Sequence, residues 1–311
     1  MSSSSKKVVY AGLAANVVIA ITKLAVAIIS GSSAMLAEAF HSMADSGNSF
    51  LLLWGMKRSQ RPAHQQHPFG HGKEVYFWSF VVAISMFAVG GVLSIWEGVS
   101  RLHRPEAVKS PLWNYVVLAT SVSISAISFV IALREIYRRK GDSGIFEFIH
   151  RSKDPTVFTV LLEDASDILG ESLAFVAIFL SVKLHNPIFD GIGSILIGFV
   201  ILSASGILAN ESRELLIGET APSKHVERMK QLLASDPAVE RVGDLLTMQL
   251  GPYDVLVNVE IQFQRQSCVE DLEQTIARLE QRVRSEFPEV HHLFVEVAFL
   301  RNQQQNLPQA S

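Results

Sequence analysis

Hydrophobic residues fill six long blocks in the first two thirds of the chain. Each block holds about 20 predominantly apolar residues, the length that a helix needs to cross the hydrocarbon of a bilayer. The first connection, Ser30-Gly31-Ser32, is so short that it predicts a tight antiparallel hairpin. The pattern therefore predicts an all-α membrane bundle of six transmembrane helices. Their expected spans are Val8–Ile29, Ser33–Trp54, Tyr76–Ile95, Trp113–Leu133, Val157–Val182 and Pro187–Ala209.

A second pattern begins near residue 221. Val226, Met229 and Leu233 have the spacing of an amphipathic helix, and apolar and polar residues alternate over 255–263 as in a half-buried strand. Apolar residues then recur every three or four positions over 269–283, which predicts a second helix that packs on the sheet. Two further strands, near 242–250 and 293–299, complete the order αββαβ. We expect a small open sheet covered by two helices.

The two patterns divide the chain into a membrane part and a soluble part. Of its 311 residues 49% are hydrophobic and 18% are charged, and the mean hydropathy is +0.27, which fits a membrane protein with a soluble domain. The formal net charge of −3 gives no basic excess for nucleic acid, and the single Cys268 excludes an intrachain disulfide. The predicted boundaries are a cytoplasmic tail (1–7), a six-helix transmembrane transport domain (8–212), a linker (213–220), a cytoplasmic domain (221–300) and a disordered tail (301–311).

Lysine and arginine are distributed unevenly between the connections. The N-terminal tail and the second and fourth loops hold most of them, and cationic loops stay on the cytoplasmic side of a membrane. Both termini are therefore predicted to be cytoplasmic. Because no cleavable targeting segment is evident, we expect a multi-pass protein of a bacterial inner (cytoplasmic) membrane.

Ionisable residues interrupt the second and fifth blocks. His41 and Asp45 are four residues apart and share one helix face, and Glu163 and Asp167 repeat that spacing with Asp164 between them. Each carboxylate at the bilayer centre costs about 2.5–3.5 kcal/mol, so such a group predicts a function. Imidazole and carboxylate together suit Zn²⁺ and other divalent first-row metals. Because these ligands lose protons when they bind a metal, metal and proton movements would be linked. The alternative is that these residues only pair across helices, with Lys23 as an available partner.

The loop after the second block reads RPAHQQHPFGHGKE, with His64, His67 and His71 within eight positions. A histidine-rich tract beside a membrane entrance indicates metal capture. The alternative is that these histidines cap turns around the proline and glycines of a simple connection.

Three segments together resemble the cation diffusion facilitators: SGSSAMLAEAFHSMADSGNS, HPFGHGKE and LLEDASDILGES. The third segment is most similar to the branch that includes the mitochondrial zinc transporter of animals. The resemblance implies a six-span divalent-metal/proton antiporter, a ferredoxin-like cytoplasmic α+β domain and a homodimer. It places the transport site on His41, Asp45, Glu163 and Asp167, with Asp164 as the alternative to Glu163. Many zinc-carrying members have histidine where this chain has Glu163, so the resemblance leaves the metal open.

The resemblance also extends to positions outside the membrane blocks. His67 and His71 match a second metal site of the family, and His64 falls where some members have aspartate. Lys73 matches a lysine that interlocks with an acidic residue after the sixth span, for which Glu219 is the candidate. In the cytoplasmic domain, positions that bear metal ligands in the family are Val259, Val295 and Val297 here, so we expect its regulatory binuclear site to be missing.

These observations predict a secondary transporter that exports a divalent metal, first of all Zn²⁺, from the cytoplasm in exchange for protons by alternating access. The expected partners are the metal ion, the lipid bilayer and a second copy of the chain, without nucleic acid and without a permanently bound cofactor. The alternative is a membrane-anchored metal sensor or scaffold that acts through the C-terminal domain. An enzyme is not expected, because no serine or cysteine nucleophile has a suitable spacing.

Overall fold

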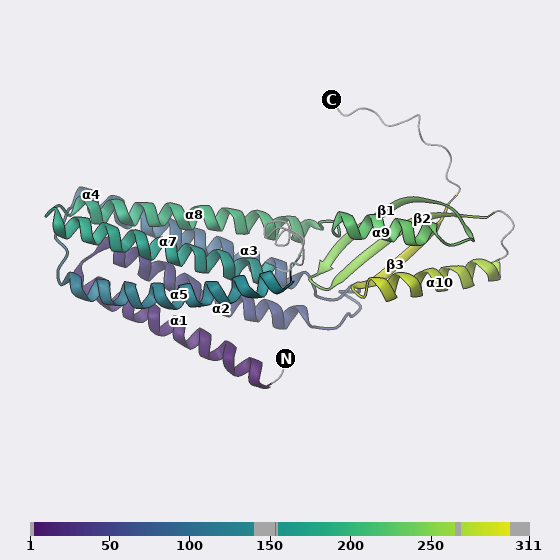
Figure 1. The fold of residues 1–311 in the computed structure, drawn as a ribbon, viewed down its shortest axis with the longest axis horizontal. Helices are drawn as coiled ribbons and strands as arrows, with labels where there is room; N and C mark the ends of the chain where they lie inside the picture. Colours follow the sequence, from purple (N-terminus) through teal and green to yellow (C-terminus); the bar gives the residue numbers. More distant parts are fainter. Residues whose placement is uncertain (1–2, 140–152, 154, 265–268, 299–311) are drawn as a thin grey trace, which may run out of the picture. The chain divides into compact units, whose positions relative to one another are not determined.

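The computed structural model describes residues 3–139, 153, 155–264 and 269–298, which form two units (Figure 1). The first unit comprises Met1–Pro62 and Glu74–Arg213, and the second comprises Ala63–Lys73 and Glu214–Ser311. The loop that bears the three histidines therefore groups with the C-terminal part of the chain. The predicted disordered tail, residues 301–311, lies outside the described residues.

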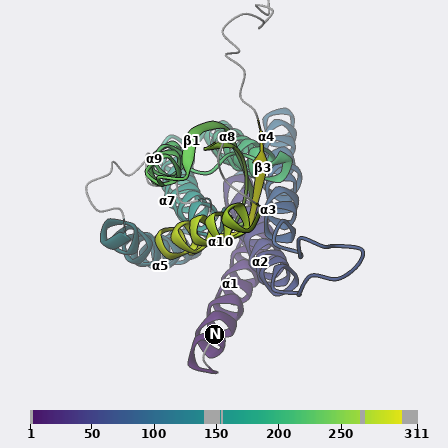
Figure 2. The same ribbon diagram turned by 90° about the vertical axis from the view of Figure 1, so that its right-hand side faces the viewer.

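Long helices that run along a common axis build the first unit, and Figure 2 shows them end-on. Helix α1 packs on α2, α5 packs on α7, and α2 also contacts α7. The helices are α1 (Ser3–Ser30), α2 (Ser33–Ser59), α3 (Glu74–Ser85), the π-helical turn η1 (Met86–Val92), α4 (Leu93–His103), α5 (Pro111–Arg139), α7 (Pro155–Lys183) and α8 (Ile188–Ile217).

Four helical stretches of the described residues are long and apolar enough to cross a membrane: Glu74–His103, Pro111–Ile131, Thr159–Lys183 and Ile188–Ile217. Helix α1 contributes a shorter apolar stretch, Asn16–Ser30. Helix α2 has sufficient length, but polar side chains interrupt its apolar sequence. The chain is thus a multi-pass membrane protein, and a full set of six spans stays a prediction.

The predicted hairpin between α1 and α2 is confirmed. Gly31 alone separates Ser30 from the α2 N-cap Ser32, and its φ of +66° is a left-handed conformation that favours glycine. Asp190 of α8 clamps the hairpin, because its carboxylate accepts hydrogen bonds from the Ser32 hydroxyl at 2.6 Å and the Ser33 amide at 2.5 Å. A helix N-terminus stabilises such a carboxylate, which explains how the unit tolerates the fully buried Asp190.

A π-helical turn, η1, lies within the run from α3 to α4. The stretch is one continuous helical segment, Glu74–His103, which extends beyond the predicted span 76–95. At η1, Gly90 approaches α8 so closely that a Cβ there would lie 2.8 Å from Ile201 Cγ2. The same Cβ would lie 3.8 Å from the Nδ1 atom of His41, so this turn also packs beside the α2 histidine. Isolated π turns of this kind are frequent at functional sites.

The C-terminal part of the second unit confirms the predicted order αββαβ. It consists of α9 (Ser223–Ala234), β1 (Val239–Gly251), β2 (Asp254–Phe263), α10 (Val269–Glu286) and β3 (Val290–Val297). The sheet order is β1-β2-β3, in which β2 pairs antiparallel with β1 and parallel with β3.

Alternation along β2 decides which face of the sheet forms the core. Val257, Val259 and Ile261 are fully buried and pack with Leu233 of α9 and Leu279 of α10. The polar residues between them point to the other face, as a period of two residues requires. That outer face also carries three exposed apolar side chains: Leu246, Met248 and Phe294.

A buried ion pair fastens α10 to the turn after α9. Asp236, whose side chain is 2% exposed, accepts hydrogen bonds of 2.9 Å from both Nε and Nη2 of Arg278, and Arg282 lies 3.4 Å away. The two hydrogen bonds from Arg278 lower the pKa of Asp236 below its usual value. Because the pKa is lowered in the folded state, this stabilisation is present above the ordinary aspartate pKa and is lost as the pH falls through the lowered value.

We expect Asp236→Asn to increase amide hydrogen exchange of α10 roughly tenfold at pH 7, because the mutation removes a charge-assisted hydrogen bond. The difference from the wild type should disappear at an acidic pH below the lowered pKa of Asp236, where this carboxylate of the wild type becomes protonated. Hydrogen-exchange mass spectrometry of the full chain in detergent measures the exchange of α10 in the variant and in the wild type at each pH. Glu280→Gln is the control, since it breaks only the half-exposed pair with Arg284. A difference that is the same at both pH values would contradict the assignment.

Candidate metal centres

Two helices of the membrane unit bring three candidate ligands together. On α2, His41 and Asp45 face the same way, and the His41 Nδ1 atom lies 3.5 Å from Asp45 Oδ1. On the neighbouring α7, Asp167 Oδ1 lies 3.3 Å from the other ring nitrogen, Nε2. One ligand atom from each of the three residues lies within 4.8 Å of the others. We call His41, Asp45 and Asp167 the His41 cluster.

The ligand atoms of the His41 cluster are buried and lack hydrogen-bond partners. Both ring nitrogens of His41, Asp45 Oδ1 and Asp167 Oδ1 have no hydrogen bond among the described residues. A buried polar atom left without a partner costs about 1–3 kcal/mol. One ligand atom from each of the three residues lies within 4.8 Å of the others, which is an arrangement that a bound cation would complete.

Glu163 and Asp164 occupy different surroundings on α7. Glu163 is 8% exposed, and its Oε1 atom accepts a hydrogen bond of 3.0 Å from Asn48 of α2. Asp164 is less buried and accepts a hydrogen bond of 2.8 Å from Ser128 of α5. Neither belongs to the His41 cluster, although both line the same cavity as Asp45 and Asp167.

That cavity lies inside the membrane unit and has a volume of about 170 Å³. Its walls come from α1, α2, α5 and α7, and its polar lining includes all four candidate acids. It thus has space for an ion with part of its water shell. The polar lining residues that concern the site are Lys23, Asp45, Glu163, Asp164, Asp167 and Glu171.

Lys23 of α1 pairs with two other acids, Glu38 of α2 and Glu171 of α7. Pairing with Lys23 therefore accounts for these two carboxylates, whereas His41 is the ion-pair partner seen for Asp45 and Asp167. The sequence interpretation named Lys23 as a possible partner but overlooked Glu38 and Asn48. The sequence does contain a signal for both residues, because they are polar side chains inside a predicted span. Glu38 lies three residues before His41, and Asn48 lies three residues after Asp45.

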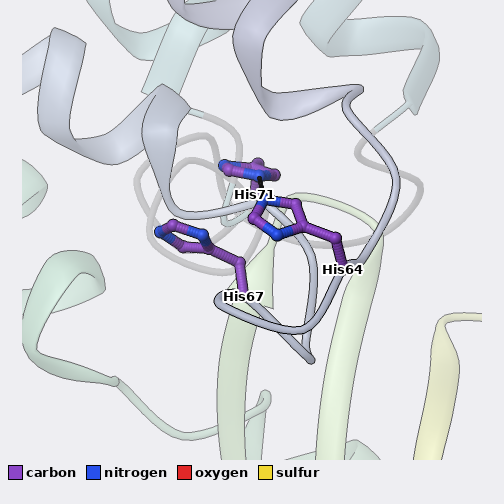
Figure 3. A group of neighbouring side chains, drawn as sticks. All are labelled: His64, His67 and His71. Carbon is purple, nitrogen blue, oxygen red and sulfur yellow. Dashed lines mark hydrogen bonds between the residues drawn. The ribbon is translucent and has the colours of Figure 1, made fainter.

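The loop of the second unit gathers its three histidines (Figure 3). His64 and His67 exchange two backbone hydrogen bonds, of 3.1 and 2.9 Å, so the chain turns back on itself. The Nε2 atoms of His64 and His71 are 3.1 Å apart, and one nitrogen from each ring lies within 4.8 Å of the others. Three imidazoles in this geometry can supply three nitrogen ligands. We call them the loop cluster.

The loop packs on the sheet of its own unit. The rings of Phe69 and His292 of β3 meet edge to face, with centroids 5.2 Å apart. A Cβ at Gly72 would collide with the carbonyl oxygen of Leu250 in β1, so only glycine permits this approach. Lys73 Nζ lies 3.4 Å from the carbonyl oxygen of Leu216, and its predicted interlock with Glu219 stays a prediction.

In the C-terminal domain, the three positions expected to lack ligands differ in burial: Val259 and Val295 pack in the core, and Val297 is exposed. Val259 is fully buried and pairs across the sheet with Val295. Within the part of the chain that the structure describes, groups of three or more neighbouring ligand residues are the His41 cluster and the loop cluster alone. The absence of the regulatory binuclear site stays a prediction.

A multi-pass membrane unit with a buried imidazole–carboxylate cluster, followed by an αββαβ domain, defines a class of membrane proteins that handle metal cations. Residues 9–217 match the cation efflux transmembrane domain, and residues 221–298 match the cytoplasmic domain of cation efflux proteins. The chain belongs to the cation efflux family, as the resemblance to the cation diffusion facilitators predicted.

Three relatives show the range of this likeness. The chain is 32% identical over 243 residues to the mitochondrial proton-coupled zinc antiporter SLC30A9 of Xenopus laevis, a match of 78% of this chain and 44% of that protein. It is 29% identical over 269 residues to metal tolerance protein C4 of Arabidopsis thaliana, covering 86% and 59% respectively. It is 21% identical over 299 residues to the manganese efflux system protein MneP of Bacillus subtilis strain 168, covering 94% and 95%. The chain therefore spans less than half the length of the frog protein.

Proposed function

We propose that the protein is a secondary transporter that exports divalent metal cations, most readily Zn²⁺, from the cytoplasm in exchange for protons. The observation that carries this proposal is the His41 cluster, whose ligand atoms converge inside a membrane unit without other partners. The names of the relatives support it, because they include a proton-coupled zinc antiporter and a manganese efflux protein.

The ligand chemistry favours zinc and leaves manganese as a competitor. One imidazole nitrogen with carboxylate oxygens suits zinc, whereas manganese prefers ligand sets rich in oxygen. We assign Glu163 as the fourth ligand, because it is buried in the same cavity and Asn48 holds it on the side of α2. Asp164 remains the alternative, and its hydrogen bond to Ser128 of α5 draws it away from α2.

Proton exchange follows from the same ligands. Imidazole and carboxylates bind a metal only after they have lost their protons, so metal entry releases protons and proton return expels the metal. No phosphate-binding loop occurs in the sequence, so a proton gradient is the proposed source of energy.

Glycines bring α4 and α8 into close contact. A Cβ at Gly98 of α4 would lie 2.7 Å from the Gly191 oxygen of α8, and one at Gly198 would lie 2.9 Å from the Gly91 oxygen. Helices α4 and α8 are thus held backbone to backbone. We propose that this pair moves as one body while α1, α2, α5 and α7 rock against it, which exposes the cavity to each side of the membrane in turn.

The C-terminal domain is proposed to hold two copies of the chain together. The outer face of its sheet presents Leu246, Met248 and Phe294, which are 64%, 37% and 50% exposed. Apolar side chains grouped on one sheet face are typical of an interaction surface. We place both termini in the cytoplasm and the protein in a bacterial inner membrane, since the basic loops lie on that side.

The loop cluster is proposed as a second metal site that captures ions. Histidines within one short loop can bind without any helix movement, and the loop is anchored to the sheet through Phe69 and Gly72. Metal bound there would act directly on the unit proposed to dimerise.

Asp45→Ala should abolish metal-driven proton exchange, lowering the rate at least about a hundredfold, because it removes a ligand from the transport site. The measurement is zinc flux in proteoliposomes under a proton gradient. Ser46→Ala is the matched control, since the Ser46 hydroxyl only bonds the Ser42 carbonyl of its own helix. Equal flux in Asp45→Ala and the wild type would refute the assignment.

Glu163→His should raise the preference for zinc over manganese about tenfold, because a second nitrogen ligand softens the site. Asp164→His, one residue further along α7, should leave the preference unchanged. The metal preference of each variant is measured from the protons released when zinc or manganese is added to the purified protein. If Asp164→His changes the preference and Glu163→His does not, the fourth ligand is Asp164.

His67→Ala should eliminate one class of metal sites in a two-site calorimetric titration and leave the His41 cluster titratable. The loss should be at least about tenfold in affinity, since two imidazoles remain of three. His103→Ala, at an exposed position on α4, is the control. A titration that still shows two unchanged sites in His67→Ala would remove the loop from the proposal.

A further inference from the structure

A second ionic group lies near the His41 cluster, and two of its three members, Lys23 and Glu171, line the cavity. Lys23 Nζ lies 2.7 Å from Glu171 Oε1 and 3.0 Å from Glu38 Oε2. All three side chains are at most 1% exposed. The hydroxyl of Ser121 on α5 also donates to Glu171 Oε1. Lys23, Glu38 and Glu171, here called the Lys23 triad, therefore join α1, α2 and α7.

Each carboxylate of the Lys23 triad lies one helical turn from a residue of the His41 cluster. Glu38 precedes His41 by three residues on α2, and Glu171 follows Asp167 by four residues on α7. Residues three or four apart share a helix face. Both carboxylates therefore lie one turn from the His41 cluster, and Glu171 also lines the cavity.

Each carboxylate also keeps one oxygen that has no hydrogen bond. Glu38 Oε1 and Glu171 Oε2 are buried and have no hydrogen-bond partner among the residues that the structure describes. Glu38 Oε1 lies against Gly170 of α7, where a Cβ would be 2.5 Å away. Each of these oxygens retains free lone pairs, and Glu171 carries its free oxygen on a residue that lines the cavity. Without the ammonium group, the Lys23 pairing would no longer hold either carboxylate.

We propose that Lys23 is a specificity-determining residue of the transport cavity, because it holds Glu38 and Glu171 in an ion triad and so keeps them out of the metal's ligand set. The inference rests on the proposed transport function. With both carboxylates held, the proposed ligands are the imidazole of His41 and the carboxylates of Asp45, Asp167 and Glu163, a set that suits the four-coordinate zinc ion. With both released, the site offers additional carboxylate oxygens, and such sets favour manganese, which takes octahedral oxygen coordination.

The test compares Zn²⁺ and Mn²⁺ uptake by the full chain in proteoliposomes under a fixed proton gradient. Lys23→Met keeps the length and apolar volume of the side chain but removes its charge. We expect the ratio of the manganese rate to the zinc rate to rise at least about tenfold. Lys183→Met is the control, since Lys183 lies at the end of α7 and its ammonium group rests over the ring of Phe179.

A triple variant identifies the cause of the change. Lys23→Met combined with Glu38→Gln and Glu171→Gln removes the cation and both carboxylates, so the ratio should return to within about threefold of the wild type. An unchanged ratio in Lys23→Met overturns the inference. So does a triple variant whose ratio stays as high as that of Lys23→Met, because the change would then not come from released carboxylates.

A second measurement applies if Lys23→Met fails to fold, since it leaves two buried acids without their cation. In Glu38→Gln/Glu171→Gln, Lys23 loses both partners, and the remaining carboxylates of the cavity belong to the metal site. We expect Lys23 to compete there and to weaken Zn²⁺ binding at least about tenfold in calorimetry, with recovery in the triple variant. Unchanged binding in the double variant would overturn the inference. If the wild type moves neither metal, the proposed function itself fails; if it moves zinc and the ratios stay equal, only the role of Lys23 fails.

Discussion

The membrane unit is organised by the need to compensate buried charge where water is scarce. A charge taken out of water costs several kcal/mol unless another charge or a set of hydrogen bonds replaces its hydration. The structure shows three arrangements. The N-terminus of α2 stabilises Asp190, Lys23 pairs with one oxygen each of Glu38 and Glu171, and among the described residues the acids of the His41 cluster have His41 but no lysine or arginine as their ion-pair partner. In the third arrangement an incoming cation would supply the positive charge that the protein does not. This missing charge is the feature that distinguishes the candidate site from the other two arrangements.

Helical spacing was sufficient to predict part of this site. A separation of four residues placed His41 and Asp45 on one face, and the structure confirms that their side chains meet. The approach of Asp167 depends on how α2 packs against α7, which no local pattern contains, and it was expected only from the family resemblance. For the same reason the sequence interpretation did not recognise Glu38 as a partner of Lys23. Ion pairs between helices require the packing geometry, whereas pairs within a helix require only the spacing.

The helices and strands were easier to predict from the sequence than which of the helices span the membrane. The αββαβ order and the core face of β2 follow from apolar periodicity, because each strand and helix buries one face. Average hydropathy, by contrast, identifies α3–α4, α5, α7 and α8 as possible spans and does not identify α2. Helix α2 carries the histidine and acids of the site, which face the interior of the unit and not lipid. Polar side chains lower the average hydropathy of α2 below the criterion, whereas α7, which bears Asp167, still satisfies it.

The chain passes between its two units three times, at Pro62–Ala63, Lys73–Glu74 and Arg213–Glu214. The loop cluster lies between the first two crossings, which directly follow α2 and precede α3. On the side of the membrane unit, Arg58 near the end of α2 holds Glu74 at the start of α3 with a 2.9 Å ion pair, and Glu74 also accepts from Trp78. The base of the loop is thus fixed where α2 ends, and its tip is fixed to the sheet. The loop is therefore restrained at its base by an ion pair of the membrane unit and at Phe69 by a ring contact within its own unit.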